Sequence, residues 1–434
     1  MASLKSSKIW LAVTILSAGL ITLGPRMAAA GSLDDLRAML SDKYRTDLAG
    51  FIDARTGVRL QNDQYQKDAS LAETRLQVDL NTDLGWGIFK LKTDLVGDAV
   101  TEEARGELRE FNLLFFPADM VDMKVGRQVL TWGTGDLLFI NDLFPKDWES
   151  FFIGRDVEYL KAPSDAIKTS FFTDLLNFDL VYVPRFNGSE YIDGSRISYW
   201  NGLLGRTAGR DFVFADDELN RFGKDDEVHA RISKNINGLE LDGYGYYGYW
   251  KTPEGVLPDG SKLFYPGLAV LGASVRNSVW GGIGNLEVGY YDSLDDRDGD
   301  NPLVRNSEVR FLAGFVRELA RDFTGGFQYY LEYMQDYGRY EMTSDPATRK
   351  DEYRHVTTVR LTKLLMNQTL TVSLFAYYSP SDQDGYLRPK FSYKVTDQLA
   401  VDGGGNWFFG KDDHTFFGQF EDASNVYAGI RWNY

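Results

Sequence analysis

The chain ends in NVYAGIRWNY, residues 425–434, and this stretch decides the fold class. Every second residue of it is apolar or aromatic, namely Val426, Ala428, Ile430, Trp432 and Tyr434. A repeat of two residues is that of a β-strand, whose successive side chains point to opposite faces. The terminus therefore predicts a strand with one apolar face and one face that carries Asn425, Arg431 and Asn433.

The same alternation recurs upstream, for instance over residues 52–61, 72–81, 369–378 and 387–395. Such segments number about eighteen and are roughly 10–14 residues long, whereas strands of globular proteins average about 5–6 residues. That length suits a strand that crosses a bilayer at a tilt. The predicted strand centres are Ala54, Leu76, Lys90, Phe111, Lys124, Thr169, Val181, Arg231, Gly243, Leu271, Leu286, Ala313, Tyr329, Val359, Val372, Phe391, Gly403 and Gly429.

The connections between these segments alternate between tight turns, as near Gly85 and Asn237, and long polar loops, as over 187–225 and 292–306. Aromatic pairs such as Tyr290-Tyr291 lie beside the loops, where an interfacial belt would place them. The pattern predicts an all-β fold, a transmembrane antiparallel up-and-down β-barrel of about 18 strands over residues 46–434. The alternative is a soluble secreted β-sandwich or solenoid, whose strands would be shorter.

The first 30 residues are typical of a signal peptide. Lys5 and Lys8 precede an apolar run over residues 9–23, and Ala28-Ala29-Ala30 offers a cleavage site. The alternative, an uncleaved anchor, would need about 20 apolar residues. Residues 31–45 carry leucines at helical spacing and predict a short periplasmic helix. The expected location is the outer membrane of a Gram-negative cell, reached through a cleaved signal peptide.

The composition excludes several kinds of chemistry. The chain has 434 residues, no cysteine, three histidines and a formal net charge of −16. Thiolate metal sites, disulfides and thiol nucleophiles are therefore absent, and the negative charge argues against a nucleic-acid partner. The acidic loop over residues 292–300 lacks the order of ligands of an EF-hand, so we expect no metal and no cofactor.

The alternation assigns charged side chains to the inner face of the barrel, because a charge facing lipid at the bilayer centre costs roughly 2–4 kcal/mol. So polar an interior predicts water, a plug or a passing solute, and barrels of about 16–18 strands enclose an aqueous channel. Arg127 breaks the pattern, since it shares the face of Val125 and Val129, and a bulge at Gly126 would turn it inward. The predicted pore-lining basic residues are Arg55, Arg59, Arg75, Lys90, Lys92, Lys124, Arg354, Arg360, Arg388, Lys390 and Arg431.

Residues 131–158 form a connection that carries many large apolar side chains, whereas most other exterior loops are polar. We expect this loop to fold inward, pack on the barrel wall and constrict the pore. Its acids would face Arg354, Arg360, Arg388 and Lys390 across the lumen and set up a transverse field. The alternative is a solvated loop with locally balanced charges. The predicted constriction residues are Trp132, Asp136, Asn141, Asp142, Asp147, Trp148 and Glu149.

Gly126-Arg127-Gln128, followed by Trp132-Gly133, Asn141-Asp142, Pro145 and the sequence YLKAP at 159–163, carries a family resemblance. This segment resembles that of alginate-export-type and related uncharacterised Gram-negative outer-membrane porins. The resemblance implies a barrel of about 18 strands that conducts anionic or polar solutes. The aromatic end at Tyr434 is similar to the segment that outer-membrane barrels present to their assembly machinery.

The expected function is an outer-membrane porin or channel for passive or selective passage of small polar solutes, anionic ones included. The alternative is a conduit or export channel working with periplasmic partners, for polysaccharide export or as a sheath around electron carriers. An enzyme is disfavoured, because His229, His355 and His414 have no adjacent serine and acid in a recognised order. The expected partners are outer-membrane lipid and lipopolysaccharide, the barrel assembly machinery, a small polar solute and a periplasmic partner.

Overall fold

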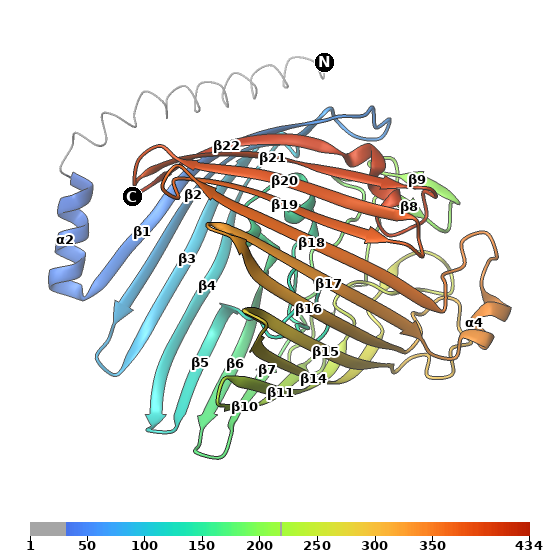
Figure 1. Cartoon of the computed structure of the whole chain (residues 1–434), viewed down its shortest axis with the longest axis horizontal. Helices are drawn as coiled ribbons and strands as arrows, with labels where there is room; N and C mark the ends of the chain where they lie inside the picture. The colour runs from blue at the N-terminus through green and yellow to red at the C-terminus, as the bar shows by residue number, and fades with distance from the viewer. Residues whose placement is uncertain (1–31, 218) are drawn as a thin grey trace.

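The computed structural model describes residues 32–217 and 219–434, so the predicted signal peptide lies outside the described residues. Eighteen antiparallel strands form one sheet that closes on itself, because β22 pairs with β1 (Figure 1). The barrel strands are β1 (Thr46–Arg59), β2 (Ala69–Asp83), β3 (Gly87–Asp98), β4 (Glu103–Ala118), β5 (Val121–Val129), β6 (Pro163–Phe172), β7 (Asn177–Val183), β10 (Glu227–Ile236), β11 (Leu239–Tyr249), β14 (Gly267–Val279), β15 (Gly282–Ser293), β16 (Glu308–Ala320), β17 (Phe323–Met334), β18 (Tyr353–Leu365), β19 (Leu370–Ser379), β20 (Asp384–Lys394), β21 (Leu399–Gly410) and β22 (Asn425–Asn433). The predicted fold class is confirmed, and each predicted strand centre lies in a different barrel strand.

The remaining elements lie at the two ends of the barrel and inside it. Helix α2 (Ser32–Tyr44), within the predicted 31–45, packs against the start of β1, and its Arg37 donates to the carbonyl of Leu48 (Figure 1). No helix in the described part of the chain is long and apolar enough to span a bilayer. The long-loop end holds α4 (Tyr337–Thr343), the 3-10 turn η2 (Gly418–Ala423), and the hairpins β8 (Tyr199–Asn201)–β9 (Arg206–Ala208) and β12 (Gly255–Val256)–β13 (Leu263–Phe264). Helix α3 (Trp148–Ile153) and the 3-10 turn η1 (Val157–Leu160) lie inside the barrel.

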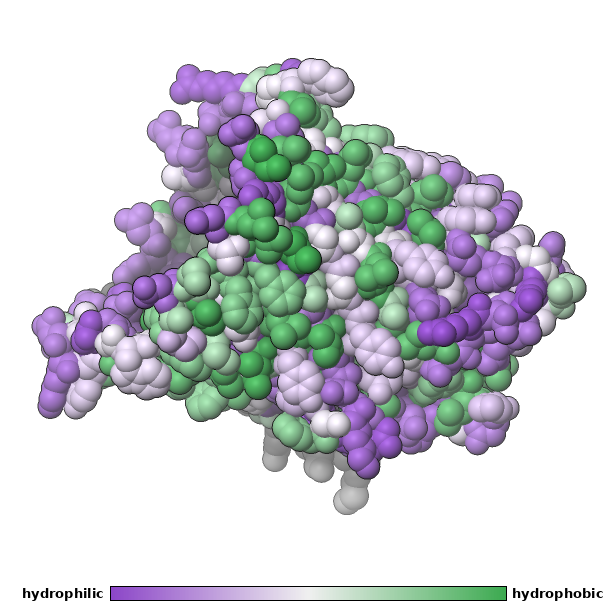
Figure 2. Space-filling model, turned by 90° about the horizontal axis from the view of Figure 1, so that it is seen from below, coloured by the Kyte–Doolittle hydropathy of each residue, from purple (hydrophilic) through white to green (hydrophobic). Residues whose placement is uncertain are grey.

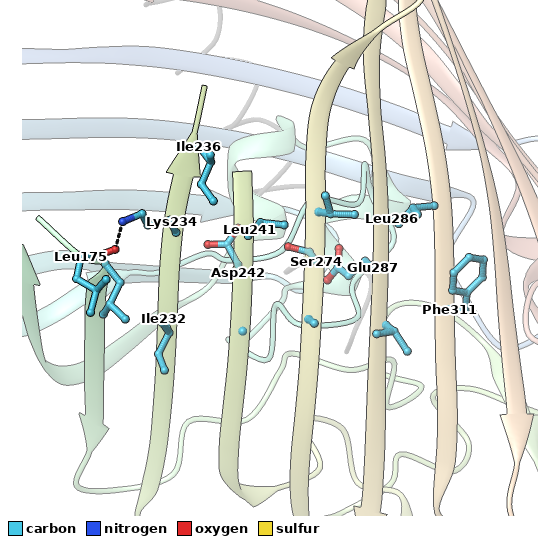
Figure 3. A pocket seen from close by; sticks show the side chains of 15 residues that line it. Leu175, Ile232, Lys234, Ile236, Leu241, Asp242, Ser274, Leu286, Glu287 and Phe311 are labelled. Atoms are coloured by element: carbon cyan, nitrogen blue, oxygen red, sulfur yellow. Dashed lines mark hydrogen bonds between the residues drawn. The ribbon is translucent and has the colours of Figure 1, made fainter. Parts of the chain in front are cut away.

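Strand register separates an apolar outer face from a polar inner face. Figure 2 shows one side of the barrel, where apolar residues gather across the middle and hydrophilic residues lie toward both ends. On β10, β11, β15 and β16 this outer face holds an apolar depression of about 900 Å³ (Figure 3), lined in part by Ile232, Leu241, Leu286 and Phe311. One row across the sheet points outward: Ile232, Gly243, Ala273, Val288 and Phe311. The next row points inward: Ser233, Asp242, Ser274, Glu287 and Leu312.

The barrel closes through the terminal aromatic residue. The backbone N–H of Tyr434 donates to Gly50 on β1 at 3.0 Å, and its hydroxyl reaches past that strand to the carbonyl of Gln77 on β2 at 2.8 Å. A Cβ at Gly50 would lie 2.6 Å from the Tyr434 hydroxyl and 2.1 Å from the Gln77 carbonyl. Gly50 therefore leaves the space through which Tyr434 joins the last strand to the second.

Gly50→Val is expected to destabilise the folded barrel by about 1–3 kcal/mol, because the new side chain displaces Tyr434 and crowds the backbone of β2. Thermal unfolding in detergent measures the loss as a lower midpoint. Gly97→Val is the matched control, since a Cβ there meets no atom within 4 Å. Equal midpoints for Gly50→Val and Gly97→Val would contradict the assigned role of the Gly50 gap.

Candidate functional site

The connection between β5 and β6, residues 130–162, folds into the barrel and is here named the inner loop. Its first part runs along the wall from β15 to β19. Asp136 pairs with Arg360 on β18 at 2.5 Å, and the carbonyl of Leu137 accepts from the hydroxyl of Tyr377 on β19 at 2.6 Å. Contacts between residues more than 200 positions apart thus hold the loop inside the lumen.

Glu287 on β15 anchors this first part of the inner loop. Its carboxylate is buried, at 2% exposure, and no Lys or Arg lies within ion-pair distance of it in the described residues. The backbone N–H groups of Thr134, Gly135 and Asn141 donate to it at 2.8–3.2 Å, and so do the Thr134 hydroxyl and the Asn141 amide at 3.0 Å. The buried carboxyl group of Glu287 therefore accepts from five donors of the loop, which curls around it.

The middle of the inner loop is held by aromatic packing. Asp147 caps the N-terminus of α3 by accepting from the backbone N–H of Ser150 at 2.7 Å. Phe152 then packs edge-on against Phe408 of β21, with ring centroids 5.1 Å apart, and Phe151 lies near Tyr386 of β20. These rings fill one side of the barrel between α3 and the wall from β19 to β22.

The return of the inner loop to β6 is held by buried ion pairs. Arg155 binds Glu73 of β2 at 2.7 Å and the Ser150 hydroxyl at 2.8 Å. The ring of Tyr159 is contacted by the guanidinium groups of Arg75 at 4.1 Å and Arg109 at 4.5 Å. Arg109 also donates to two loop carbonyls, so side chains of β2 and β4 hold the returning chain.

The loop between β7 and β10 covers the inner loop from outside. The backbone N–H of Trp148 donates to the carbonyl of Glu190 at 3.1 Å, and that of Lys146 donates to the Ser189 hydroxyl at 3.0 Å. Arg196 is fully buried, pairs with Asp98 of β3 and lies 3.1 Å from Glu149. Burial raises the pKa of Glu149, although Arg196 opposes that shift. Two connections thus interlock within the mouth of the barrel.

The Gly126-Arg127-Gln128 motif builds the base of the inner loop. Gly126 has φ +117°, and a Cβ there would lie 2.2 Å from the carbonyl of Phe111. The Gln128 amide donates to the carbonyl of Ala166 at 3.0 Å, and Arg127 donates to the Leu108 carbonyl at 2.7 Å. The motif therefore ties β4, β5 and β6 together at the loop end.

The bulge considered at Gly126 is absent, because β5 pairs with β4 and with β6 without a register shift at this point. Arg127 stays on the outer face opposite Phe111 and binds both carboxylate oxygens of Asp165 at 3.1 Å. An outward charge is tolerated here because it lies near the loop end of β5, with an acid beside it. A bulge lies instead on the neighbouring β4, where the register shift between Lys92 and Thr93 leaves Arg109 as the extra residue.

The predicted pore-lining basic residues fall into three groups. Arg55, Arg75 and Arg388 point inward but are at most 7% exposed, because the inner loop covers them. Arg59 is held by the carbonyls of Ala69 and Arg196, and Arg354 pairs with Glu332 and Asp382. The others keep some exposure within the lumen: Lys90, Lys92, Lys124, Arg360, Lys390 and Arg431.

The predicted constriction residues have distinct roles. Of the four loop acids, only Asp136 pairs with the opposite basic wall. Asp142 pairs with Lys146 within the loop at 3.0 Å, whereas Asp147 caps α3 and Glu149 lies beside Arg196. Another loop acid, Asp156, lies 3.9 Å from Lys390 and 3.8 Å from Arg431, where the predicted acids do not reach. Desolvation raises the pKa of Asp156, but the two cations outweigh it and hold the pKa below its usual value.

Of the other predicted constriction residues, Trp132 and Trp148 pack against aromatic rings and Asn141 forms hydrogen bonds. Trp132 lies against Phe144, His229 and Tyr244, with the nearest ring centroid 5.1 Å away. Trp148 stacks near Phe139, Phe151 and Phe152, and Asn141 joins the Glu287 cluster. The large apolar side chains of the loop therefore bury themselves inside the barrel.

Sequence reasoning missed Arg109, Arg155, Lys168 and Glu287. Strict alternation would have found Lys168, which follows the outward Ile167, and Glu287, which precedes the outward Val288. Arg109 could not be found in this way, because the bulge reverses its face. Arg155 lies outside any strand, so only its contact with Glu73 reveals it.

The three histidines lie apart from one another. His229 is buried among rings and stacks on Phe144 at 4.4 Å, while His355 bonds the hydroxyl of Tyr329 at 2.7 Å. His414 lies in the last loop beside Trp200. In the described residues no histidine ring bonds both a serine and an acid, and no group of three His, Asp or Glu could hold a metal ion.

Comparison with known proteins places the fold. No family model matches the chain, and no curated protein does. Among solved structures it is similar to Pseudomonas aeruginosa OccK5 (OpdH), at 9% identity and TM-score 0.56 over 89% of this chain and 97% of that one. It is also similar to Acinetobacter baumannii OccAB3, at 11% identity and TM-score 0.54 over 90% and 99% of the two chains. A third similar structure is Pseudomonas aeruginosa OccD3 (OpdP), at 8% identity and TM-score 0.52 over 90% of this chain and 91% of that one.

Identities this low show only a shared fold, here a barrel of similar extent. The solute therefore has to be inferred from this chain's own residues. The resemblance to alginate-export-type porins stays a prediction.

Proposed function

We propose that this protein is an outer-membrane channel that passes small polar solutes, anionic ones preferred, through the lumen beside the inner loop. The observation that carries the proposal is a row of four cations on neighbouring inner positions, called the basic row: Lys90, Lys124, Lys168 and Arg231. Lys124 and Lys168 are direct cross-strand partners. Like charges in that position repel, so an anion between them is stabilised.

The acids beside the basic row are less accessible than the cations. Glu110 binds Lys90 and Lys124, and Asp179 binds Lys168 and Arg231. Their side chains are 11% and 10% exposed, and those of Asp79 near Lys90 and Asp242 near Arg231 are 18% and 15% exposed, against 27–31% for the four cations. A solute in the lumen therefore meets positive charge first, and the carboxylates behind it hold the cationic side chains in place. The field of such a row concentrates anions locally.

The inner loop disfavours the alternative of a sheath or exporter for a wide cargo. Its bonds reach Glu287, Gln328, Arg360 and Tyr377 on one side of the barrel and Glu73 on the other. A lumen crossed in this way suits small solutes.

The basic row is tested by replacing all four residues with glutamine in the folded, full-length mature protein. The ratio of anion to cation permeability is expected to fall by about tenfold, because the local enrichment of anions is lost. Reversal potentials across planar bilayers in a salt gradient measure this ratio. A control carries the same change at Arg206, Arg297, Arg321 and Arg339, which lie in the connections between barrel strands and whose side chains are 45–97% exposed.

An unchanged reversal potential in the basic-row variant would refute anion preference. Absence of any conductance from correctly folded wild-type protein would refute the channel itself.

A further inference from the structure

A basic and aromatic surface lies outside the barrel, at the loop end of β7 and β10. The turn at residues 220–225 is tied to the end of β7, because the N–H of Gly223 donates to the Pro184 carbonyl at 2.7 Å and that of Phe186 donates to the Asp225 carbonyl at 2.6 Å. These bonds bring together Arg185, Arg221, Phe222 and Lys224, which we call the rim patch.

The rim patch continues on the outer face of the barrel. Arg185 lies 3.5 Å from Asp165, the acid that also binds Arg127. Asp165 and Arg127 are cross-strand partners, two positions along from the outward pair of Ile167 and Val125. The guanidinium of Arg185 therefore faces the surroundings of the barrel rather than its lumen.

The rim patch is strongly exposed and has an excess of accessible positive charge. The side chains of Arg221 and Arg185 are 67% and 48% exposed, and the ring of Phe222 between the cations is 79% exposed. Arg221 holds the pKa of Asp225 below its usual value by hydrogen bonding, and that carboxylate is 1% exposed. Of the nearby acids, Asp225 is buried, Asp165 is shared between Arg185 and Arg127, and Asp226 is half-buried beside Tyr182, while the three cations of the rim patch are exposed.

Aromatic residues next to the rim patch indicate its level relative to the membrane. Tyr182 and Tyr247 flank Val228 on the outer face, and the ring of Tyr247 is 64% exposed. Tyrosine prefers the interface between hydrocarbon and headgroups. Arg185 lies three residues beyond Tyr182 toward the loops, which places the rim patch at the level of lipid headgroups.

We propose that the rim patch binds the phosphate groups of an outer-leaflet phosphorylated glycolipid. Arg185, Arg221 and Lys224 contact the phosphates, and Phe222 inserts among the uppermost acyl carbons. Guanidinium and ammonium groups are the usual ligands of phosphate, and an exposed phenyl ring gains free energy by leaving water. The inference rests on the outer-membrane location given under the proposed function, but it does not require conduction.

The test uses the folded mature protein in detergent, titrated with diphosphoryl lipid A and followed by native mass spectrometry. The variant carries Arg185→Gln, Arg221→Gln and Lys224→Gln. Its affinity for the lipid is expected to fall by about a hundredfold, because each basic residue near an anionic lipid surface contributes about a fivefold factor. A control carries Arg297→Gln and Arg339→Gln, two exposed residues in other connections between barrel strands. Phe222→Ser alone is expected to weaken binding by a smaller factor.

Two further ligands separate the sources of phosphate. Dephosphorylated lipid A is expected to bind as weakly to wild-type protein as the intact lipid does to the triple variant. Inorganic phosphate at equal concentration is expected not to compete. Equal binding of intact and dephosphorylated lipid, competition by free phosphate, or an unchanged affinity of the triple variant would each overturn the proposal. Bilayer conductance of the triple variant should equal that of wild type, so a failure of the channel and a failure of the lipid site are distinguishable.

Discussion

Glu287→Ala is expected to enlarge the channel and make its current unsteady. The substitution removes the acceptor of five hydrogen bonds from Thr134, Gly135 and Asn141. Bonds to a charged group contribute roughly 1.5–3 kcal/mol each, and water replaces part of that when the loop detaches. Even a net loss of about 3 kcal/mol shifts the balance between attached and detached loop by more than about a hundredfold. The first part of the inner loop then leaves the wall.

Single-channel recording in planar bilayers measures this effect as a higher mean conductance with added flicker. Glu287→Gln keeps the shape but turns two amide hydrogens toward the donors, so an effect in the same direction is expected. Glu240→Gln removes the same charge from a half-exposed side chain whose nearest cation, Arg276, is 3.9 Å away, and it should conduct like wild type. If Glu287→Ala also conducts like wild type, Glu287 is not the anchor.

Arg155→Met is expected to cause the largest loss of stability. Arg155 is 5% exposed and binds Glu73 through Nε and Nη2 at 2.9 and 2.7 Å. Removal leaves Glu73 and Asp94 to Arg75 alone, whereas Glu107 keeps Arg105 as a second partner. An uncompensated buried charge costs about 3–5 kcal/mol. The thermal midpoint in detergent should fall accordingly, and proteolysis of the inner loop should quicken.

A second substitution tests whether the loss of stability in Arg155→Met is caused by an unpaired charge or by lost packing. Glu73→Gln in the Arg155→Met background removes the surplus charge, so the double variant should recover part of the lost stability. Arg105→Met is the control, because its side chain is 30% exposed and such accessible pairs contribute about 1 kcal/mol or less. A double variant no more stable than Arg155→Met would show that packing, and not charge, explains the loss.

The number and order of the barrel strands were predictable because side-chain alternation is a local property of an extended chain. It failed where one extra residue enters a strand, as at Arg109, since a bulge reverses the face on which the residues beyond it lie. It also left Arg127 unexplained, because the acid that stabilises it, Asp165, is 38 residues away in the chain and adjacent only across the β5–β6 pair.

The apolar content of residues 131–158 predicted an inward loop, and the structure buries Phe144, Phe151 and Phe152 inside the barrel. The wall residues that bind this loop could not be predicted from the sequence, because Glu287 is 146 residues from Asn141 and Arg360 is 224 residues from Asp136. The ion pairs between the inner loop and the basic wall are accordingly Asp136 with Arg360 and Asp156 with Lys390 and Arg431. Any transverse field of the predicted kind depends on these pairs.

The sequence by itself determined the strands, most of their faces and the aromatic end of the last strand at Tyr434, since side-chain alternation depends on residues that are neighbours in the chain. Only the tertiary structure decided which charges line the lumen, because closure of the barrel brings the inner loop against distant strands. That closure buries Arg55 and Arg75 beneath the loop and leaves Lys124 and Lys168 accessible. The difference between a buried ion pair and an accessible cation depends on what covers each residue.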